Sequence, residues 1–298
     1  MNSTHHVELR GVSKLYGAQR AVNQVDLVLK AGESVGLAGH NGAGKSTIIK
    51  LILGLITPEE GSVLLLGEQV GSRSGAHARS QIGYLPETVG LHPSLTGKET
   101  LDFYAKLKKQ PLNKNADLLA RVGIAQAAGR RVGTYSKGMR QRLALAQALL
   151  GAPKVLLFDE PTTGLDPASR QMFYEIIREL NAEGATVLLS THALAELDGH
   201  ADRIVVMKNG SKVADGSMNE LQVQSGLPVS IRVRLKRELP LSAAWQRSDG
   251  LSYHASCRTE ERMQLLNELG GMDNIDDIDI HTPTLDDMYA EFLKREDV

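Results

Sequence analysis

The stretch from Gly39 to Thr47 concentrates residues whose types and spacing suit the binding of an anion. It reads G-H-N-G-A-G-K-S-T and fits the pattern G-x-x-x-x-G-K-[ST]. Glycines carry no Cβ, so the backbone can turn sharply and point its N–H groups at a ligand. Lys45 is long enough to reach the β- and γ-phosphates of a nucleotide, and the Ser46 hydroxyl is placed to ligand Mg²⁺. The predicted contacts are Gly39, His40, Asn41, Gly42, Ala43, Gly44, Lys45, Ser46 and Thr47.

The elements on either side of this stretch suit that chemistry. Residues 34–38 are short and apolar, as expected of a buried strand. Residues 48–52 continue as a helix, whose N-terminal partial positive charge would face the same anion. A glycine-rich turn of no function is the alternative, and the strand–loop–helix context argues against it.

Two further strand ends carry candidate catalytic groups. Asp159 and Glu160 close the apolar run 155–158. The first carboxylate suits Mg²⁺, and the second is placed to orient or deprotonate an attacking water. His192 ends the strand 186–189 and is a candidate γ-phosphate sensor. The plainer alternatives are an acidic pair at a turn and a strand-end histidine with ordinary partners.

Three weaker candidates complete the set. Ser136 and Gly138 precede an Ala- and Leu-rich helix, whose N-terminus could cradle another phosphate. Tyr16 is expected in a turn at residues 14–17, either stacked on a base or merely packed. Glu87 follows the strand 82–85, at the edge where open α/β sheets bind ligands.

Composition narrows the class of protein. The chain has 298 residues and a net charge of −1, so no broad basic field favours nucleic acid. Cys257 is the only cysteine, which fits a reducing compartment. No apolar run reaches 18 residues, so we expect no membrane span. The first six residues lack the basic and apolar segments of a secretory leader.

The order of elements predicts an α/β fold. Strands alternating with helices indicate a largely parallel sheet, with an antiparallel β portion at the start. Residues 71–80 are expected to form a surface loop, and residues 91–150 are expected to be helical. After about residue 225 a small α+β module is expected, which ends in the helical stripe 285–292. That stripe is either core of its own module or a dimer contact.

These motifs resemble, in the same order, those of ABC-type ATPases, the nucleotide-binding subunits of membrane transporters. Residues 39–47 match Walker A, residues 155–160 match Walker B, and residues 135–139 are similar to the L-S-G-G-Q signature. The resemblance implies a P-loop NTPase fold. Residues 1–224 would form the ABC-type ATP-binding domain, with a helical subdomain at about 88–150. Residues 225–298 would form the C-terminal module.

The resemblance also implies roles and partners. Glu160, His192 and Lys45 would be catalytic, Tyr16 would stack on adenine, and Ser46, Asp159 and Glu87 would surround Mg²⁺. ATP would lie between Walker A of one subunit and Ser136 of another in a homodimer. A separate integral membrane permease would dock on residues 88–110, at the cytoplasmic face of the bacterial inner membrane.

This sequence departs from the family pattern at three places. Tyr135, Lys137 and Met139 replace the Leu, Gly and Gln of the commonest signature, His40 replaces a usual Pro, and Glu87 replaces a Gln. The S-K-G-M signature and the segment Thr284–Tyr289 resemble single-cassette subunits paired with six-helix permeases. Within them, the chain is similar to ATPases that serve maturation of the copper enzyme nitrous oxide reductase. A soluble ABC ATPase of another assembly or repair process is the alternative.

Overall fold

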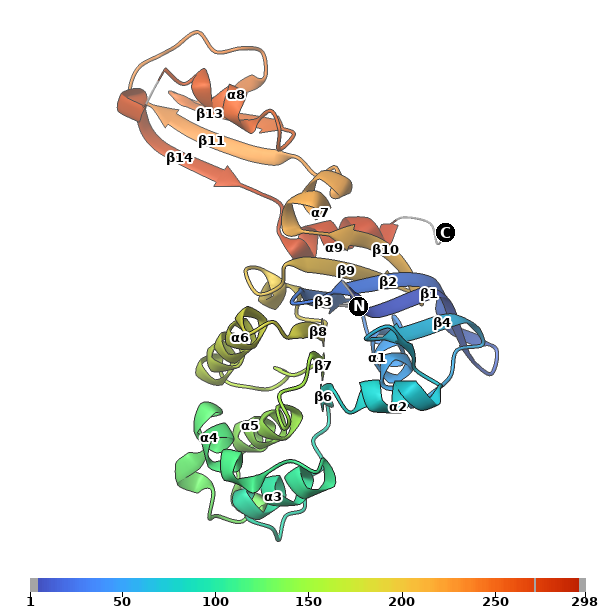
Figure 1. Ribbon diagram of the computed structural model, residues 1–298. Helices are drawn as coiled ribbons and strands as arrows, with labels where there is room; N and C mark the ends of the chain where they lie inside the picture. The colour runs from blue at the N-terminus through green and yellow to red at the C-terminus, as the bar shows by residue number, and fades with distance from the viewer. Residues whose placement is uncertain (1–4, 271, 295–298) are drawn as a thin grey trace. The chain divides into compact units, whose positions relative to one another are not determined.

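The computed structural model describes residues 5–270 and 272–294. The described residues divide into two compact units, residues 5–213 and residues 214–294 without residue 271. Figure 1 shows the elements of both units, coloured along the chain. Residues 1–4, on which part of the expectation about a leader rests, lie outside the described residues. The predicted division at residues 224/225 stays a prediction.

An antiparallel sheet opens the first unit, as the alternating sequence predicted. Its order is β2-β1-β4-β5. The strands are β1 (His5–Tyr16), β2 (Gln19–Lys30), β4 (Glu60–Leu65) and β5 (Glu68–Gln69). The predicted turn at residues 14–17 was wrong for residues 14–16, which belong to β1, and Tyr16 pairs with Gln19. The strand runs on to this point because the chain reverses over only residues 17 and 18.

The second sheet has six strands in the order β10-β9-β3-β8-β7-β6. The strands from β9 to β6 are parallel to one another, as predicted. Their carboxyl ends therefore meet at one edge of the sheet. They are β3 (Ser34–Ala38), β6 (Ile82–Leu85), β7 (Val155–Asp159), β8 (Thr186–Thr191), β9 (Arg203–Lys208) and β10 (Ser211–Gly216).

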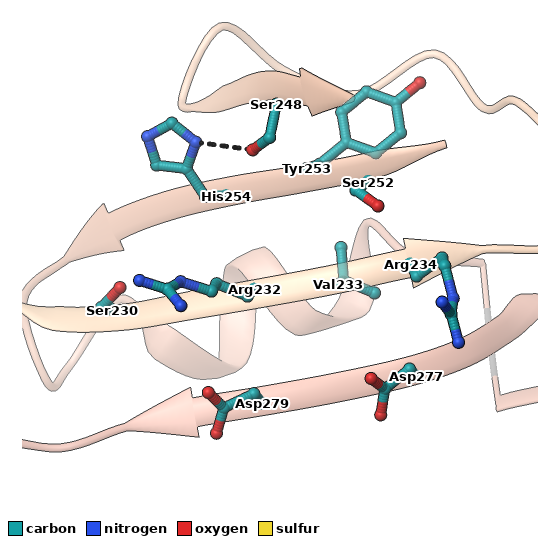
Figure 2. Close-up of a pocket in the computed structure, with 10 residues that line it drawn as sticks. All are labelled: Ser230, Arg232, Val233, Arg234, Ser248, Ser252, Tyr253, His254, Asp277 and Asp279. Carbon is teal, nitrogen blue, oxygen red and sulfur yellow. Dashed lines mark hydrogen bonds between the residues drawn. The ribbon is translucent and has the colours of Figure 1, made fainter. Parts of the chain in front are cut away.

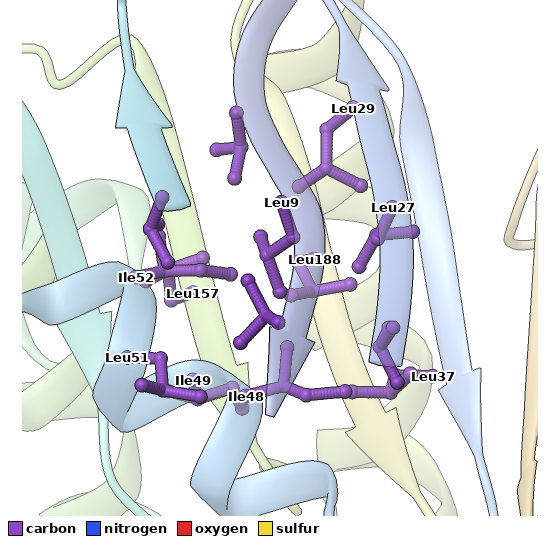
Figure 3. Packing of buried hydrophobic residues seen from close by; sticks show 14 of the residues in the cluster. Leu9, Leu27, Leu29, Leu37, Ile48, Ile49, Leu51, Ile52, Leu157 and Leu188 are labelled. Carbon is purple, nitrogen blue, oxygen red and sulfur yellow. The ribbon is translucent and has the colours of Figure 1, made fainter. Parts of the chain in front are cut away.

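Helix α1 (Lys45–Leu53) packs between the two sheets. Figure 3 shows its apolar side chains against leucines of the antiparallel and the parallel sheet, such as Leu9 and Leu188. Ile48 and Ile52 are fully buried there. Because the helix has apolar contacts on two sides, its first turn is fixed in place at the end of β3.

Five more α-helices belong to the described part of the first unit. The region 91–150 is helical as predicted. A capping box joins Thr96 and Glu99 at the start of its first helix, Gly97–Leu107. The loop expected at 71–80 was wrong, because the Ser72 hydroxyl accepts the Gly75 N–H at 3.0 Å and starts a short helix. The helices are α2 (Arg73–Arg79), α3 (Gly97–Leu107), α4 (Asn115–Arg121), α5 (Lys137–Ala148) and α6 (Pro167–Ala182). Single 3₁₀ turns are η1 (Leu112–Lys114), η2 (Ala125–Ala127), η3 (Val132–Thr134) and η4 (Leu194–Leu197).

The second unit is a four-stranded antiparallel sheet in the order β12-β13-β11-β14, with helices. One face of β11 packs on α8 through an apolar cluster that includes the buried Cys257. The elements are α7 (Met218–Ser225), β11 (Val229–Leu235), β12 (Trp245–Asp249), β13 (Ser252–Cys257), α8 (Arg262–Asn267), η5 (Met272–Asn274), β14 (Ile275–His281) and α9 (Leu285–Lys294). Among residues 5–270 and 272–294, no helix has both the length and the apolar character needed to cross a membrane.

Candidate functional site

A hollow of about 300 Å³ lies where the parallel strands end. It is lined by the loop after β3 together with groups that follow β6, β7 and β8. The lining residues are Tyr16, Gln19, Ala21, His40, Asn41, Gly42, Gly44, Lys45, Ser46, Thr47, Glu87, Glu160 and His192. Most of the residues singled out from the sequence are therefore brought together, whereas Ser136 and Gly138 lie elsewhere.

The loop before α1 has a backbone that only glycine tolerates well at two positions. Gly42 and Gly44 have φ of 86° and 103°, in the left-handed region. A Cβ on Gly44 would also lie 2.4 Å from the carbonyl oxygen of Ala21. Gly44 is the N-cap of α1, and no side chain caps that helix end. The first N–H groups of α1 are therefore left for an anionic partner.

Lys45 is held at the base of the loop. Its side chain is buried, and Nζ donates to the carbonyl oxygens of Gly39 at 2.6 Å and His40 at 3.3 Å. The same ammonium lies 3.5 Å from Oε1 of Glu160. The lysine thus joins the glycine loop to the carboxylate that follows β7.

Asp159 sits directly behind the loop. Its Oδ1 accepts from the Ser46 hydroxyl at 3.2 Å and from the Ser190 hydroxyl at 2.6 Å. Ser190 is a site residue that was not predicted. Ser190 lies one residue before the end of β8 and is in register with Asp159 of the neighbouring parallel strand, a pairing that no sequence motif displays. The Ser46 hydroxyl and the Asp159 carboxylate are hard oxygen groups of the kind that Mg²⁺ prefers.

Glu160 is buried and has an unusual backbone. Its φ of 48° lies in the left-handed region, which is costly for a residue with a side chain and is concentrated at functional sites. Oε2 accepts from His192 Nδ1 at 2.7 Å and from Thr163 Oγ1 at 3.5 Å. Oε1 has no hydrogen-bond partner within the described part of the chain, although its atom is buried. One carboxylate oxygen is thus anchored and the other is left to act as an acceptor.

Glu87 and Tyr16 lie at the rim of the hollow. Glu87 is exposed, and the described residues give its carboxylate no hydrogen bond or ion pair. It also lines a neighbouring hollow of about 290 Å³ together with Lys137 and Arg140. Tyr16 is 49% exposed, and the Lys14 ammonium lies 5.8 Å from its ring centroid. Gln19 and Ala21 complete the rim, and no sequence motif includes them.

The start of α5 lies outside this hollow. The Ser136 hydroxyl accepts the Met139 N–H at 3.2 Å and so caps the helix. Gly138 has room for a side chain, since a Cβ there would come no nearer than 3.6 Å to another residue. Tyr135 is buried and its hydroxyl donates to the Ala127 carbonyl at 2.6 Å. The tyrosine that departs from the usual signature therefore anchors the helix start to the preceding helical region.

A separate hollow of about 660 Å³ lies on the outer face of the second unit's sheet. Figure 2 shows arginines of β11 beside aspartates of β14 and, on the other side, His254 with Ser248. Arg232 is in register with Asp279, and Arg234 with Asp277. Alternating columns of opposite charge are typical of the solvated face of an antiparallel sheet.

The chain is similar to known proteins over the segment that carries most of these residues. The family model for the ABC transporter matches residues 22–163. The Nod factor export ATP-binding protein I of Burkholderia orbicola (strain AU 1054) is 40% identical over 219 residues, which span 72% of each chain. The linearmycin resistance ATP-binding protein LnrL of Bacillus subtilis (strain 168) is 35% identical, over 72% of this chain and 70% of the relative.

Solved structures give the same result. An ATP-binding subunit of an ABC transporter superposes with a TM-score of 0.68 at 34% identity, over 74% of this chain and 93% of that one. MJ0796, a bacterial ABC transporter cassette solved as a dimer, gives a TM-score of 0.66 at 28% identity, over 71% and 98%. The predicted fold is confirmed, and the chain belongs to the ABC transporter ATP-binding subunits, whose cassette is an ATPase that binds ATP with Mg²⁺.

Proposed function

We propose that this chain hydrolyses ATP as the motor subunit of a bacterial ABC exporter, with Glu160 and His192 as catalytic residues. The observation that carries the proposal is the meeting of three groups at one hollow. Lys45 Nζ lies 3.5 Å from Glu160 Oε1, and His192 Nδ1 lies 2.7 Å from Glu160 Oε2. They come from the start of α1 and from the residues after β7 and β8, so the fold and not local sequence brings them together.

The residues present fit ATP and Mg²⁺. The glycine loop leaves open space above Gly42 and offers uncapped N–H groups at the start of α1. Ser46 and Asp159 already share a hydrogen bond at 3.2 Å, so their oxygens lie close enough to share one cation. Lys45, residues 39–44 and Thr47 would hold the phosphates, and Tyr16 would hold the base.

Bound MgATP supplies the phosphoryl group and the cation that balances its charge. The buried Glu160 Oε1 accepts the proton of an attacking water or orients that water. His192, with 53% of its side chain exposed, is anchored through Nδ1 to Glu160 and turns the rest of its ring to the hollow. Lys45 would stay with the phosphates and keep positive charge beside them.

The other half of the site would come from a second copy of the chain. Ser136 is exposed at the N-terminus of α5 and, with Gly138, lies outside the hollow of its own chain. A helix start presented in this way suits the phosphates of a nucleotide held by a second subunit. MJ0796, a cassette solved as a dimer, supports dimerisation of such chains. We therefore propose a homodimer with two composite sites.

The export role is carried over from the relatives, whose names describe Nod factor export and linearmycin resistance. We propose peripheral attachment to a separate permease at the cytoplasmic face of the bacterial inner membrane, through residues 88–110. A narrower proposal is that the chain resembles NosF and helps to assemble the copper site of nitrous oxide reductase. It is supported only by the signature at residues 135–139 and the segment Thr284–Tyr289. Copurification of the tagged full chain with a membrane protein, and identification of that protein, tests both. Recovery without any membrane protein would contradict the permease role.

The catalytic assignment is tested by Glu160→Gln. The amide keeps the shape of the side chain but cannot take a proton, so we expect hydrolysis to fall by about two to four orders of magnitude while ATP still binds. Glu183→Gln is the matched control, because this carboxylate is exposed at the end of α6 and pairs only with Arg121 among the described residues. Native hydrolysis in a folded Glu160→Gln variant would refute the assignment.

A further inference from the structure

Glu196 is a largely buried carboxylate with three partners. It lies in the turn η4, four residues after His192, and its side chain is 13% exposed. Oε2 accepts from Thr162 Oγ1 at 2.6 Å and from the Tyr174 hydroxyl at 3.1 Å. Oε1 pairs with Arg170 Nη1 at 2.9 Å. A buried charge with this many partners is costly to disturb, because removal of the carboxylate leaves its partners unpaired.

The partners of Glu196 belong to the chain that follows Glu160. Thr162 is buried two residues after Glu160. Arg170 and Tyr174 lie in the first half of α6, and Arg170 Nη2 also donates to the Leu165 carbonyl at 3.3 Å. Glu196 therefore ties the segment after His192 to residues 162–174.

The same two segments carry the reacting groups. Glu160 and His192 touch directly at 2.7 Å, but that contact sits at the hollow and depends on the backbone behind it. Behind Glu160, the chain is held on one side by Gln141 Nε2, which donates to the Pro161 carbonyl at 2.9 Å. Thr162 and Glu196 hold it on the other side. Glu196 itself does not line the hollow.

We propose that Glu196 is a positioning residue for ATP hydrolysis, which fixes the His192 segment against the segment that carries Glu160. It acts through these two residues and makes no contact with the nucleotide. The inference rests on the proposed roles of Glu160 and His192. It predicts that loss of Glu196 slows the chemical step without weakening nucleotide binding, because the glycine loop and α1 are not among its partners.

The test compares Glu196→Ala with Glu196→Gln in the purified full chain, with MgATP as substrate. Displacement of reacting groups by about 1 Å costs up to about 100-fold, so we expect kcat to fall about 10- to 100-fold in Glu196→Ala, with KM nearly unchanged. Glu196→Gln keeps an oxygen acceptor for Thr162 and Tyr174 and should recover most of the rate. Glu175→Ala is the control, since this exposed carboxylate of α6 bonds only to Gln171 among the described residues.

Thr162→Val gives an independent arm if Glu196→Ala folds poorly. It removes the 2.6 Å hydrogen bond but keeps the side-chain shape, so kcat should fall and KM should hold. In the double variant Thr162→Val/Glu196→Ala the two losses should not add, because both remove the same hydrogen bond. Equal losses of thermal stability, ATP affinity and rate, with no rescue by Gln, would mean a merely structural role. Full kcat in Glu196→Ala, with Glu160→Gln inactive, would overturn this inference alone, whereas an active Glu160→Gln would overturn the proposed function.

Discussion

At the scale of single residues, the charged groups of the site differ in the number of hydrogen bonds that they make within the protein. Asp159 has two hydroxyl donors on one oxygen, and Lys45 has two carbonyl acceptors. Glu160 has one anchored oxygen and one without a hydrogen-bond donor. A carboxylate with one free oxygen is suited to accepting a proton.

Glu87 is the residue at which this chain differs most from the family pattern in chemical terms. Its carboxylate is exposed at the boundary between the nucleotide hollow and the hollow lined by Lys137 and Arg140. We expect Glu87→Gln and Glu87→Ala to change the basal ATPase of the purified chain several-fold at most, because Glu87 makes no hydrogen bond or ion pair with Glu160 or His192 among the described residues. Permease-stimulated ATPase should fall sharply in Glu87→Ala if Glu87 relays coupling.

The two assays separate three outcomes for Glu87. Collapse of basal hydrolysis as complete as in Glu160→Gln would place Glu87 among the catalytic groups. Both activities surviving in Glu87→Ala would remove the coupling role. Loss of the stimulated rate alone is the result that we expect.

At the scale of elements, one buried hydroxyl helps to hold the start of α5 to the preceding helical region. Tyr135→Phe removes the hydrogen bond to the Ala127 carbonyl, which keeps only the Arg130 N–H at 2.9 Å, so the free energy of unfolding should fall by about 1 kcal/mol. Denaturant unfolding measures it. Tyr104→Phe is the control, because the described residues give its hydroxyl no partner and it should change stability by less than about 0.5 kcal/mol. Equal effects of the two changes would contradict the anchoring role.

An element could be predicted when its own residues show a clear hydrophobic pattern. The strands 34–38, 82–85 and 155–158 were predicted nearly to their bounds, because strands buried on both faces read as continuous apolar runs. β12 and α2 were missed. The first is a polar edge strand, and the second depends on a serine cap in a Gly- and Ser-rich segment, so neither has a clear periodicity.

The residues of the site also fall into a group that could be predicted from the sequence and a group that could not. The glycine loop, Asp159, Glu160 and His192 were predictable because their residue types fit phosphate chemistry at strand ends. Ser190 and Glu196 were not singled out, because their importance comes from contacts with Asp159 and Thr162 that a single sequence does not display. Motifs therefore identified the groups facing the hollow, and only the structure identified those that hold them.

At the scale of the whole molecule, the proposed dimer is tested by Gly138→Asp in the Glu160→Gln background. A carboxylate there would repel the phosphates held by a second subunit. It should not harm the fold, because a Cβ fits and an acidic residue is favourable in the first turn of a helix. Light scattering should show an ATP-dependent dimer for Glu160→Gln, whereas the double variant should bind ATP as a monomer.

Gly129→Asp is the matched control for that experiment. Gly129 is an exposed glycine of the same helical region, with open space around its Cβ position. The Gly129→Asp change adds the same charge away from the start of α5, so the ATP-dependent dimer should persist. Dimerisation of the Gly138→Asp variant as strong as that of the control would count against a composite site.

The pairing of β3 has a consequence for how the protein is made. β3 carries the glycine loop, yet its neighbours in the sheet are β8 and β9, and Leu37 pairs with Ser190 and Val205. On the ribosome, the β1–β2 hairpin can form from local contacts soon after synthesis. β3, buried along its whole length in the finished fold, must wait until about residue 205 has emerged. The loop that is encoded among the first fifty residues therefore gains its shape late, and nascent chains need protection of this apolar strand before ATP can stabilise them.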